Sequence, residues 1–239
     1  MRLFGKKPVL ERIKTDPGSI TALYLRQKVQ LALVVNEAKR AGLTFESVPS
    51  NEFSRLCGDV NAQGVMAEVK EYSYTPLPVM LKDALKEKKV LVFVDGVTDP
   101  QNFGSMIRNL ACLGGFSLII PEHESVCVNE TVLRVACGGE NYITIAKVVN
   151  SVRGILAAKE KGFYCAGAVC DDGDELIACD LKFPLAVVIG SEGKGIRPGI
   201  LKHLDARLSL PMPGAKLSYN AGSAAALFCY EIKRKMKCL

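Results

Sequence analysis

The chain has 239 residues, of which 49% are hydrophobic and 23% are charged, and its formal net charge is +6. These values are typical of a globular protein that buries a core without disulfides, and they exclude an intrinsically disordered chain. The length suits one large domain or a small and a medium one. The mild basicity permits a polyanionic partner, although a soluble enzyme without one fits the charge equally well.

Cysteine and histidine usage limits the expected cofactors and compartment. The chain has nine cysteines, none in C-x-x-C spacing, and only two histidines, His123 and His203. A structural zinc site needs clustered ligands, so we expect no metal. Several cysteines lie in apolar runs and resemble small buried residues, which fits a reducing cytosol and a cytoplasmic protein. The start lacks the apolar core of a signal peptide, and without a run of about 18 apolar residues we expect no membrane span.

The first part of the chain predicts a small α/β domain. Apolar periodicity predicts strands at 20–25, 44–48 and 65–69 and helices at 29–42 and 51–57. Pro76 and Pro78 bias residues 71–79 toward extended structure, which places a domain boundary there. We therefore expect a small domain at 1–75, a linker at 76–85 and a larger domain at 86–239.

The second part alternates short apolar runs with helical segments. Strands are predicted at 90–96, 116–121, 142–146, 163–169 and 185–190, and helices at 80–88, 101–113, 129–136, 149–161 and 217–236. This alternation is typical of a largely parallel α/β sheet. Ligands of open parallel sheets bind beyond the carboxyl ends of the strands, so the segments after VLVFVDG and LAVVIG are the first candidates for a site.

Two of these segments carry unusual polar and glycine content. In DGVTDPQNFGSMIRNLACLGG, Asp99-Pro100 predicts a turn into a helix, from which Asn102 and Arg108 could project toward the strand ends. In VVIGSEGKGIRPG, three glycines let the backbone approach a ligand, but neither the Walker A nor the dinucleotide spacing is present. Glu192 in this loop favours a cationic or neutral ligand over a pyrophosphate. Taken singly, a capped helix and an ordinary glycine-rich turn explain these residues as well.

The third segment, LSLPMPGAKLSYNAGSAAALFCYEI, predicts a strand, a turn after two prolines and a helix with a small-residue face. Ser218 and Asn220 lie at the start of that helix, where Ser218 would serve as an N-cap if it had no other role. The small residues would permit close packing against a neighbour.

The order and content of the three segments resemble the motifs of the SpoU/TrmH family of SPOUT RNA methyltransferases. The matching patterns are N-x-G-x-x-x-R, then G-x-E-x-x-G-(I or M)-R, then LPM followed by S-x-N at a helix start. The resemblance covers about 86–239. GKKPVLERI and QGVMAEV resemble the small ribosomal-protein-like RNA-binding domain of the ribosomal-RNA members, including the group that methylates a guanosine of 23S ribosomal RNA.

The resemblance implies a parallel α/β sheet whose C-terminal stretch forms a trefoil knot, with S-adenosylmethionine bound in the knot. Members are homodimers with the active site near the subunit interface. Carried over by motif, the cofactor-binding positions are Ile189, Gly190, Leu210, Met212 and Tyr219.

The catalytic positions implied by the motifs are Asn102, Arg108, Glu192, Ser218 and Asn220. Family proposals make the arginine the base that activates the ribose 2′-hydroxyl. Arginine stays protonated in nearly every protein, so we favour a role for Arg108 in holding the adjacent phosphate or stabilising the developing alkoxide. Glu192 and Asn102 would position Arg108 or the ribose, and Ser218 and Asn220 would hold the loop and the cofactor.

The sequence departs from the family pattern at three positions. Tyr219 replaces a leucine at the cofactor wall, Gly222 replaces a second serine in the third motif, and Ala62 stands where a histidine is frequent ahead of Gln63-Gly64. The changes leave Arg108, Glu192 and Asn220 in place, so we still expect an active enzyme.

Other functions remain open at this stage. A transfer-RNA methyltransferase of the same family, a resistance-type ribosomal-RNA methyltransferase and a non-catalytic RNA-binding or ribosome-assembly protein all fit, the last favoured only by Gly222. A Rossmann oxidoreductase is disfavoured by the missing fingerprint. RNA phosphates could contact Lys6, Lys7, Arg12 and Lys14, although a solvated basic terminus explains these residues equally well. The basic tail, with Lys233, Arg234, Lys235 and Lys237, is the expected end of a solvated helix.

Overall fold

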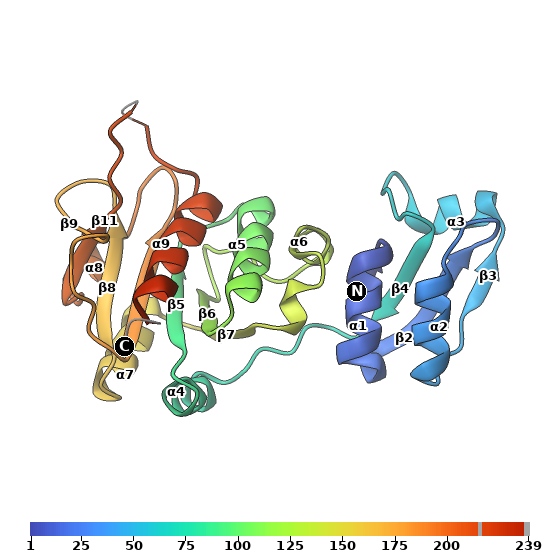
Figure 1. The fold of residues 1–239 in the computed structure, drawn as a ribbon, viewed down its shortest axis with the longest axis horizontal. Helices are drawn as coiled ribbons and strands as arrows, with labels where there is room; N and C mark the ends of the chain where they lie inside the picture. Colours follow the sequence, from blue (N-terminus) through green and yellow to red (C-terminus); the bar gives the residue numbers. More distant parts are fainter. Residues whose placement is uncertain (215–216, 237–239) are drawn as a thin grey trace. The chain divides into compact units, whose positions relative to one another are not determined.

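The computed structural model describes residues 1–214 and 217–236 (Figure 1). Lys237, part of the predicted helix end, lies outside the described residues. The chain divides into two compact units. The first comprises Met1–Ser73 and Val128–Tyr142, and the second comprises Tyr74–Cys127 and the residues from Ile143 onward.

The first unit is built on a four-stranded sheet. Its strands are β1 (Arg2–Phe4), β2 (Ile20–Arg26), β3 (Glu46–Val48) and β4 (Val65–Val69), in the order β1-β4-β2-β3. Its helices are α1 (Lys6–Thr15), η1 (Pro17–Ser19), α2 (Ala32–Arg40), α3 (Ser50–Cys57), α6 (Glu130–Ala136) and η2 (Gly139–Asn141). The last two come from the connection between two strands of the other unit, so this unit is discontinuous in sequence.

The second unit is a seven-stranded sheet in the order β7-β6-β5-β10-β8-β11-β9, in which every neighbouring pair is parallel. The strands are β5 (Val90–Asp95), β6 (Phe116–Pro121), β7 (Thr144–Val148), β8 (Tyr164–Val169), β9 (Asp174–Glu175), β10 (Leu185–Gly190) and β11 (Ala206–Ser209). All residues of β5 and β6 are buried, as expected for central strands covered on both faces. The predicted parallel α/β sheet is confirmed.

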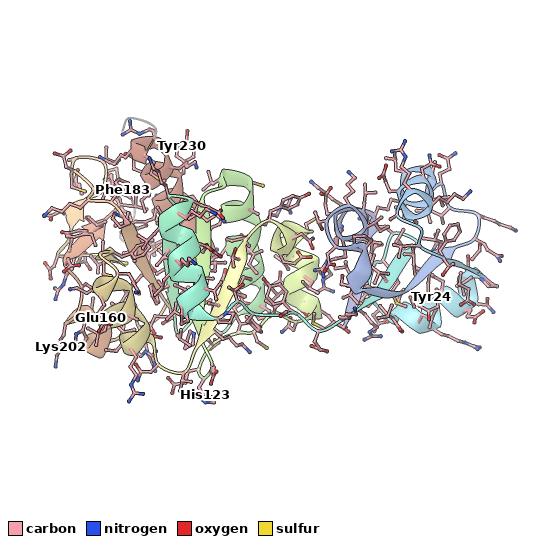
Figure 2. All side chains as sticks on the ribbon, turned by 90° about the horizontal axis from the view of Figure 1, so that it is seen from below. Tyr24, His123, Glu160, Phe183, Lys202 and Tyr230 are labelled. Carbon is pink, nitrogen blue, oxygen red and sulfur yellow. The ribbon has the colours of Figure 1, made fainter. Side chains whose placement is uncertain are left out.

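Helices cover both faces of this sheet. α4 (Leu77–Lys86), α7 (Ser151–Glu160) and α8 (Pro198–Leu201) share one core with alternate strand residues, among them Leu91 and Phe93. α5 (Pro100–Leu113) and α9 (Ala221–Met236) pack side by side, with α9 against β10 and α5 against β6 (Figure 1). Because strand side chains alternate between faces, each apolar strand contributes to both layers. The side chains that fill them are drawn in Figure 2.

Most predicted elements are present, and the differences have local causes. The predicted helix at 80–88 begins at Leu77, because Pro76 and Pro78 stand at its start, where proline is tolerated. β1 and α1 were not predicted, although Val9 and Ile13 have helical spacing and are buried. Arg12 in α1 is also buried, and it donates to Ser19 and Glu140. The expectation that Arg12 contacts RNA phosphates is therefore wrong.

Two observations concern only the part of the chain that the structure describes. None of its helices is both long and apolar enough to cross a bilayer. Within residues 1–214 and 217–236, no group of three or more histidine, cysteine, aspartate or glutamate residues is arranged to hold a metal ion.

Candidate active site

A cavity of about 440 Å³ lies where β8, β10 and β11 end. These strands are neighbours in a parallel sheet, so their carboxyl ends and the loops that follow them meet at one edge. The cavity is walled by residues 168–171 after β8, 189–196 after β10, 210–212 after β11, and the approach and first turns of α9. Its position is the one that the sheet order predicts for a ligand.

The glycine-rich loop after β10 is a tight hairpin folded back on Gly190. Ser191 and Gly195 exchange backbone hydrogen bonds of 3.2 and 2.9 Å. A Cβ added to Gly190 would lie 2.2 Å from the Gly195 carbonyl carbon and 2.4 Å from the Ile196 nitrogen. Glycine is thus required at this position because backbone, not a movable side chain, fills the space.

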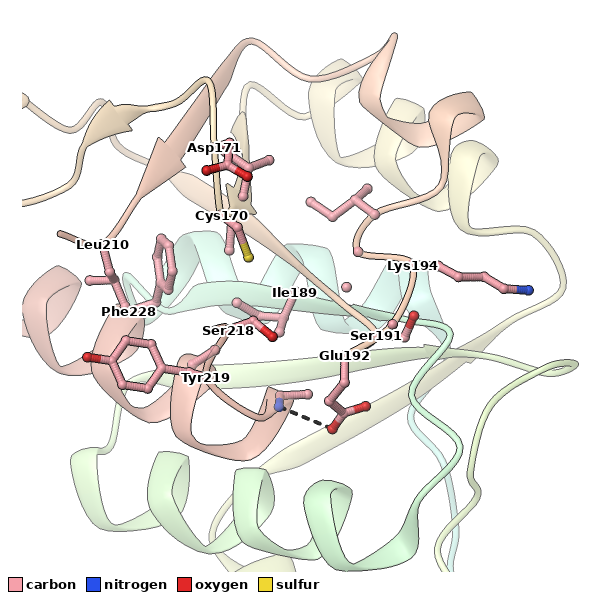
Figure 3. A pocket seen from close by; sticks show the side chains of 18 of the residues that line it. Cys170, Asp171, Ile189, Ser191, Glu192, Lys194, Leu210, Ser218, Tyr219 and Phe228 are labelled. Carbon is pink, nitrogen blue, oxygen red and sulfur yellow. Dashed lines mark hydrogen bonds between the residues drawn. The ribbon is translucent and has the colours of Figure 1, made fainter. Parts of the chain in front are cut away.

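Glu192, at the tip of this loop, links the three sequence motifs. One of its carboxylate oxygens, Oε1, accepts a short hydrogen bond from the side-chain amide of Asn102 in α5. The same oxygen accepts a bond of 3.2 Å from the backbone nitrogen of Ala221 at the start of α9 (Figure 3). The carboxylate therefore ties the helix N-termini of α5 and α9 together, where a negative charge is favoured.

The start of α9 is capped by Asn220 rather than Ser218. Asn220 Oδ1 accepts a bond of 2.7 Å from the Ser223 nitrogen, and its carbonyl accepts from Ala224. Ser218 is exposed and lines the cavity, as does Tyr219. The cap needs a side-chain oxygen at the residue just before the first helical turn, and Ser218 lies too far upstream.

Gly222 has a packing role in this arrangement. A Cβ added there would lie 3.3 Å from the Asn102 carbonyl oxygen and 3.3 Å from the Ser105 side chain. The absence of a side chain lets α9 approach α5 at the point where Glu192 joins them. The departure from the family serine therefore has a structural account.

The five residues expected to bind the cofactor all line the cavity: Ile189, Gly190, Leu210, Met212 and Tyr219. Glu192 and Ser218 also line it. Asn102 and Asn220 do not line it; Asn102 donates to Glu192, and Asn220 accepts from the Ser223 nitrogen. Sequence reasoning missed the wall after β8 and the side chain of Phe228. The order β10-β8-β11, which periodicity does not reveal, is what brings residues 168–171 to the cavity.

The missed wall includes two polar residues. Figure 3 shows Cys170, Ile189, Ser218 and Glu192 around the same hollow, with Asp171 above them and Lys194 pointing away. Asp171 and Glu192 thus place two carboxylates on the lining of a cavity whose other walls are largely aliphatic.

Arg108 is not brought to the cavity. It is exposed on α5, six residues beyond Asn102, which corresponds to about 240° around a helix, so the two side chains occupy different faces. Within one chain, therefore, Arg108 does not line the cavity that Glu192 and Ser218 line.

Arg197, the arginine of the second motif, is instead committed to carboxylates. Its backbone nitrogen donates to Asp95 Oδ2 at 2.9 Å, and its Nε donates to Asp95 Oδ1 at 2.8 Å. A third nitrogen, Nη1, donates to Glu124 at 3.0 Å. The hydrogen bond to Asp95 raises the pKa of Arg197 further above its usual range. This pair anchors the end of the loop to the carboxyl end of β5.

Comparison with known proteins decides the family. Residues 89–230 match the model described as the SpoU rRNA Methylase family, and residues 2–75 match that for RNA 2′-O ribose methyltransferase substrate binding. The chain belongs to the SpoU rRNA methylase family. The family resemblance drawn from the three motifs is thereby confirmed.

Relatives within the SpoU family align over nearly the whole chain. An uncharacterized tRNA/rRNA methyltransferase of Synechocystis is 32% identical over 98% of this chain, which spans 62% of that relative's length. The 23S rRNA (guanosine-2′-O-)-methyltransferase RlmB of Pectobacterium atrosepticum is 30% identical over 98% of this chain and 97% of its own. The solved structure of the SpoU methyltransferase AviRb of Streptomyces viridochromogenes, in complex with AdoMet, aligns with a TM-score of 0.82 at 20% identity. That alignment covers 100% of this chain and 91% of AviRb, and it shows that the fold is shared.

Proposed function

We propose that this protein transfers a methyl group from S-adenosylmethionine to a ribose 2′-hydroxyl in RNA, with a guanosine of large-subunit ribosomal RNA as the expected target. The observation that carries the proposal is the cavity at the carboxyl edge of the sheet, which residues 189–196 line. Glu192 in this lining accepts hydrogen bonds from both α5 and α9. The RlmB relative supports the choice of ribosomal RNA. The match of residues 2–75 to the substrate-binding model supports RNA as the substrate.

The cavity suits the chemistry of this cofactor. The aliphatic and aromatic side chains of Leu210, Met212 and Phe228 offer walls for an adenine ring, and the glycine-rich backbone offers hydrogen-bonding groups. Asp171 and Glu192 place negative charge beside a ligand whose sulfonium is cationic. When bound, the cofactor supplies an electrophilic methyl group. We also propose that the segment from β10 to α9 forms the family's trefoil knot around it.

The residues of the chain would bind and orient the reactants. A ribose hydroxyl is a weak nucleophile until its proton is removed or shared. Glu192 holds Asn102 and the start of α9 in place, so we assign it a positioning role, and Asn220 fixes that start through its cap. Arg108 would hold a phosphate or the developing alkoxide through its guanidinium group.

The role of Arg108 is tested by the pH dependence of single-turnover methyl transfer. In Arg108→Lys, we expect a slower rate with the wild-type pH profile, because an electrostatic contact does not titrate in the range assayed. A kinetic pKa that moves toward that of lysine would instead establish Arg108 as the base.

A homodimer would complete the site. Arg108 lies outside the cavity of its own chain, and α9 exposes Leu227 and Tyr230 at 42% and 62%. Leu217, on the approach to α9, is 73% exposed. We propose that a second copy covers these side chains. Light scattering should give twice the chain mass for the wild type, and Tyr230→Asp should shift the mass toward the monomer.

The RNA substrate is tested by incubating the enzyme and S-adenosylmethionine with unmethylated large-subunit ribosomal RNA and, in parallel, with transfer RNA. A 2′-O-methyl group removes the nucleophile for alkaline cleavage, so the modified position appears as a gap in an alkaline ladder. We expect one gap in ribosomal RNA at a guanosine. A gap in transfer RNA alone would support the transfer-RNA alternative, and cofactor binding without any gap would support the non-catalytic one.

A further inference from the structure

A second cavity of about 310 Å³ lies at the same carboxyl edge of the sheet, on the side of β6 and β7. Three loops line it: residues 121–124 after β6, 149–152 between β7 and α7, and 197–200 at the start of α8. The glycine-rich loop lines the first cavity with residues 189–196 and the second with the residues that follow directly. The proposed mechanism leaves this second cavity without a role.

Two carboxylates already bind the guanidinium group of Arg197, so only the rest of this group can contact a ligand in the cavity. Its Nε and Nη2 atoms lie 2.8 and 2.6 Å from Asp95 Oδ1, and its Nη1 donates to Glu124. These carboxylates occupy the edge of the guanidinium plane, and yet 43% of the side chain stays exposed. The printed carboxylate contacts use one hydrogen on each guanidinium nitrogen, so the flat face of the group can still stack on an aromatic ring.

The charges around Arg197 argue against a phosphate ligand. One guanidinium is paired with two carboxylates, Asp95 and Glu124, so the cluster carries a net charge of about −1 before His123 is counted. A phosphate would be repelled by this cluster, whereas a neutral ring with amino groups would not. Glu124 is 77% exposed and can accept hydrogen bonds from such groups.

The walls supply apolar surface and further polar atoms. Val149 is 72% exposed beside the cavity, and Pro121 and Ile200 are buried in its wall. Asn150 uses its side-chain oxygen to accept from the Arg153 nitrogen, so its amide group is the part that remains as a donor. His123 stands exposed at the rim (Figure 2).

We propose that this second cavity binds one unpaired nucleobase of the RNA substrate, stacked on the Arg197 guanidinium face with Val149 as an apolar wall. The inference rests on the proposed function, which supplies the RNA. Unpaired bases are the elements of RNA that proteins read by stacking on arginine planes and by hydrogen bonds to base edges. The cavity would recognise a nucleotide other than the one whose ribose is methylated, because it is lined by different strands from the first cavity.

Gly199 provides a direct test. Gly199 lines the cavity and a Cβ added there meets no atom within 4 Å, so Gly199→Phe adds a bulky side chain at the lining without a clash at Cβ, and Gly199→Ala is the matched control. We expect Gly199→Phe to raise the half-saturating concentration of unmethylated large-subunit ribosomal RNA by about tenfold, the size of one lost base stack. Gly199→Ala should stay within about twofold of wild type by the same reasoning, and the S-adenosylmethionine affinity should stay unchanged in both.

A second pair of variants removes the wall without filling the space. Val149→Ser should weaken RNA binding, whereas Val79→Ser, at an exposed valine of α4 that is 48% accessible, should not. Filter binding at several salt concentrations separates base from backbone contacts. The slope of log Kd against log salt should be unchanged in Gly199→Phe, since only a lost phosphate contact lowers it by about one.

The outcomes distinguish this proposal from the proposed function. Methyl transfer with unchanged RNA half-saturation in Gly199→Phe would overturn the nucleobase site and leave the function standing. No transfer by the wild type would overturn the function, and direct RNA binding would then still decide the site. A lowered salt slope would identify a phosphate contact, and a weakened cofactor affinity would show that the variant acts on the first cavity. Either result overturns the nucleobase site.

Discussion

Gly190→Ala should disable the cavity proposed to bind the cofactor, because the added Cβ clashes with backbone. The added Cβ would lie 2.2 Å from the Gly195 carbonyl carbon, 2.4 Å from the Ile196 nitrogen and 2.5 Å from the Gly195 oxygen, whereas ordinary contacts begin at 3.4 Å. The hairpin must therefore move by about 1 Å at its base. Because all three atoms belong to the backbone, a change of side-chain rotamer cannot relieve the clash.

The magnitude follows from what the movement disrupts. Overpacking a well-packed site costs about 1–3 kcal/mol of folding free energy. Loss of the two Ser191–Gly195 hydrogen bonds adds about 0.5–1.5 kcal/mol each. We expect Gly190→Ala to lower the free energy of unfolding by roughly 2–6 kcal/mol. The displaced loop should also abolish measurable S-adenosylmethionine binding.

Gly193→Ala, in the same hairpin, is the control. A Cβ at Gly193 meets no atom within 4 Å, so the variant should stay within about 0.5 kcal/mol of wild type and bind the cofactor. Urea unfolding measures the stability, and titration calorimetry measures the cofactor affinity. Equal behaviour of the two variants would refute the close approach of the loop to Gly190.

Three further predictions concern single hydrogen-bonded groups. Glu192→Ala leaves the Asn102 amide and the Ala221 nitrogen without their acceptor and should lower the free energy of urea unfolding by on the order of 1–2 kcal/mol. Glu192→Gln keeps one side-chain oxygen and should lower it by less. Equal losses in the two variants would contradict the shared-oxygen geometry. Asn220→Ala removes the α9 cap and should cost about 1 kcal/mol, whereas Asn220→Asp should restore it, and a neutral alanine variant would show that the cap is dispensable. Partial burial alone would raise the pKa of Asp205, but hydrogen bonds from Lys159 and the Cys165 nitrogen lower it below its usual value. The stabilisation is thus present above the unfolded-state pKa of about 3.9 and is lost as pH falls through the lower folded value. Acid unfolding of Asp205→Asn should lack this component, and an unchanged acid profile would contradict it.

Apolar periodicity predicted the sheet because local patterns carry it. The run VLVFVDG becomes β5, buried along its length, and LAVVIG becomes β10, with boundaries that agree within about one residue. The three glycines of the loop after β10 were expected to let the backbone approach a ligand, whereas at Gly190 the space is filled by another part of the loop. What approaches it, the backbone of Gly195, depends on how the hairpin closes, which spacing alone does not specify.

Long-range pairings were outside the reach of sequence reasoning. Nothing in the sequence indicates that residues 128–142 group with the first unit, because the contacts that hold them there join distant residues. Arg12 is bonded to Glu140 in a buried pair, and Arg2 donates to Glu130. Burial of the Glu140 carboxyl raises its pKa, an effect that requires the folded environment. Arg12 was misread as a phosphate contact for the same reason.

The candidate site was predicted by chemistry more than by geometry. Glu192 and Asn102 were expected to act together, and the structure joins them by a hydrogen bond. Ser218 was the expected cap if it had no other role, but Asn220 takes that position, since the helix begins at Ala221 instead of 217. The start at Ala221 places Asn220 directly before the first turn, where its side-chain oxygen accepts from the Ser223 nitrogen.

The measurement that tests the central claim most directly is transfer of labelled methyl from S-adenosylmethionine to unmethylated ribosomal RNA, by the wild type and by Arg108→Ala. The account predicts label at ribose in the wild-type reaction and its loss in the variant, with the variant's cofactor affinity unchanged because Arg108 lies outside the cavity. Cofactor binding without transfer of label, or label that persists in Arg108→Ala, would contradict it.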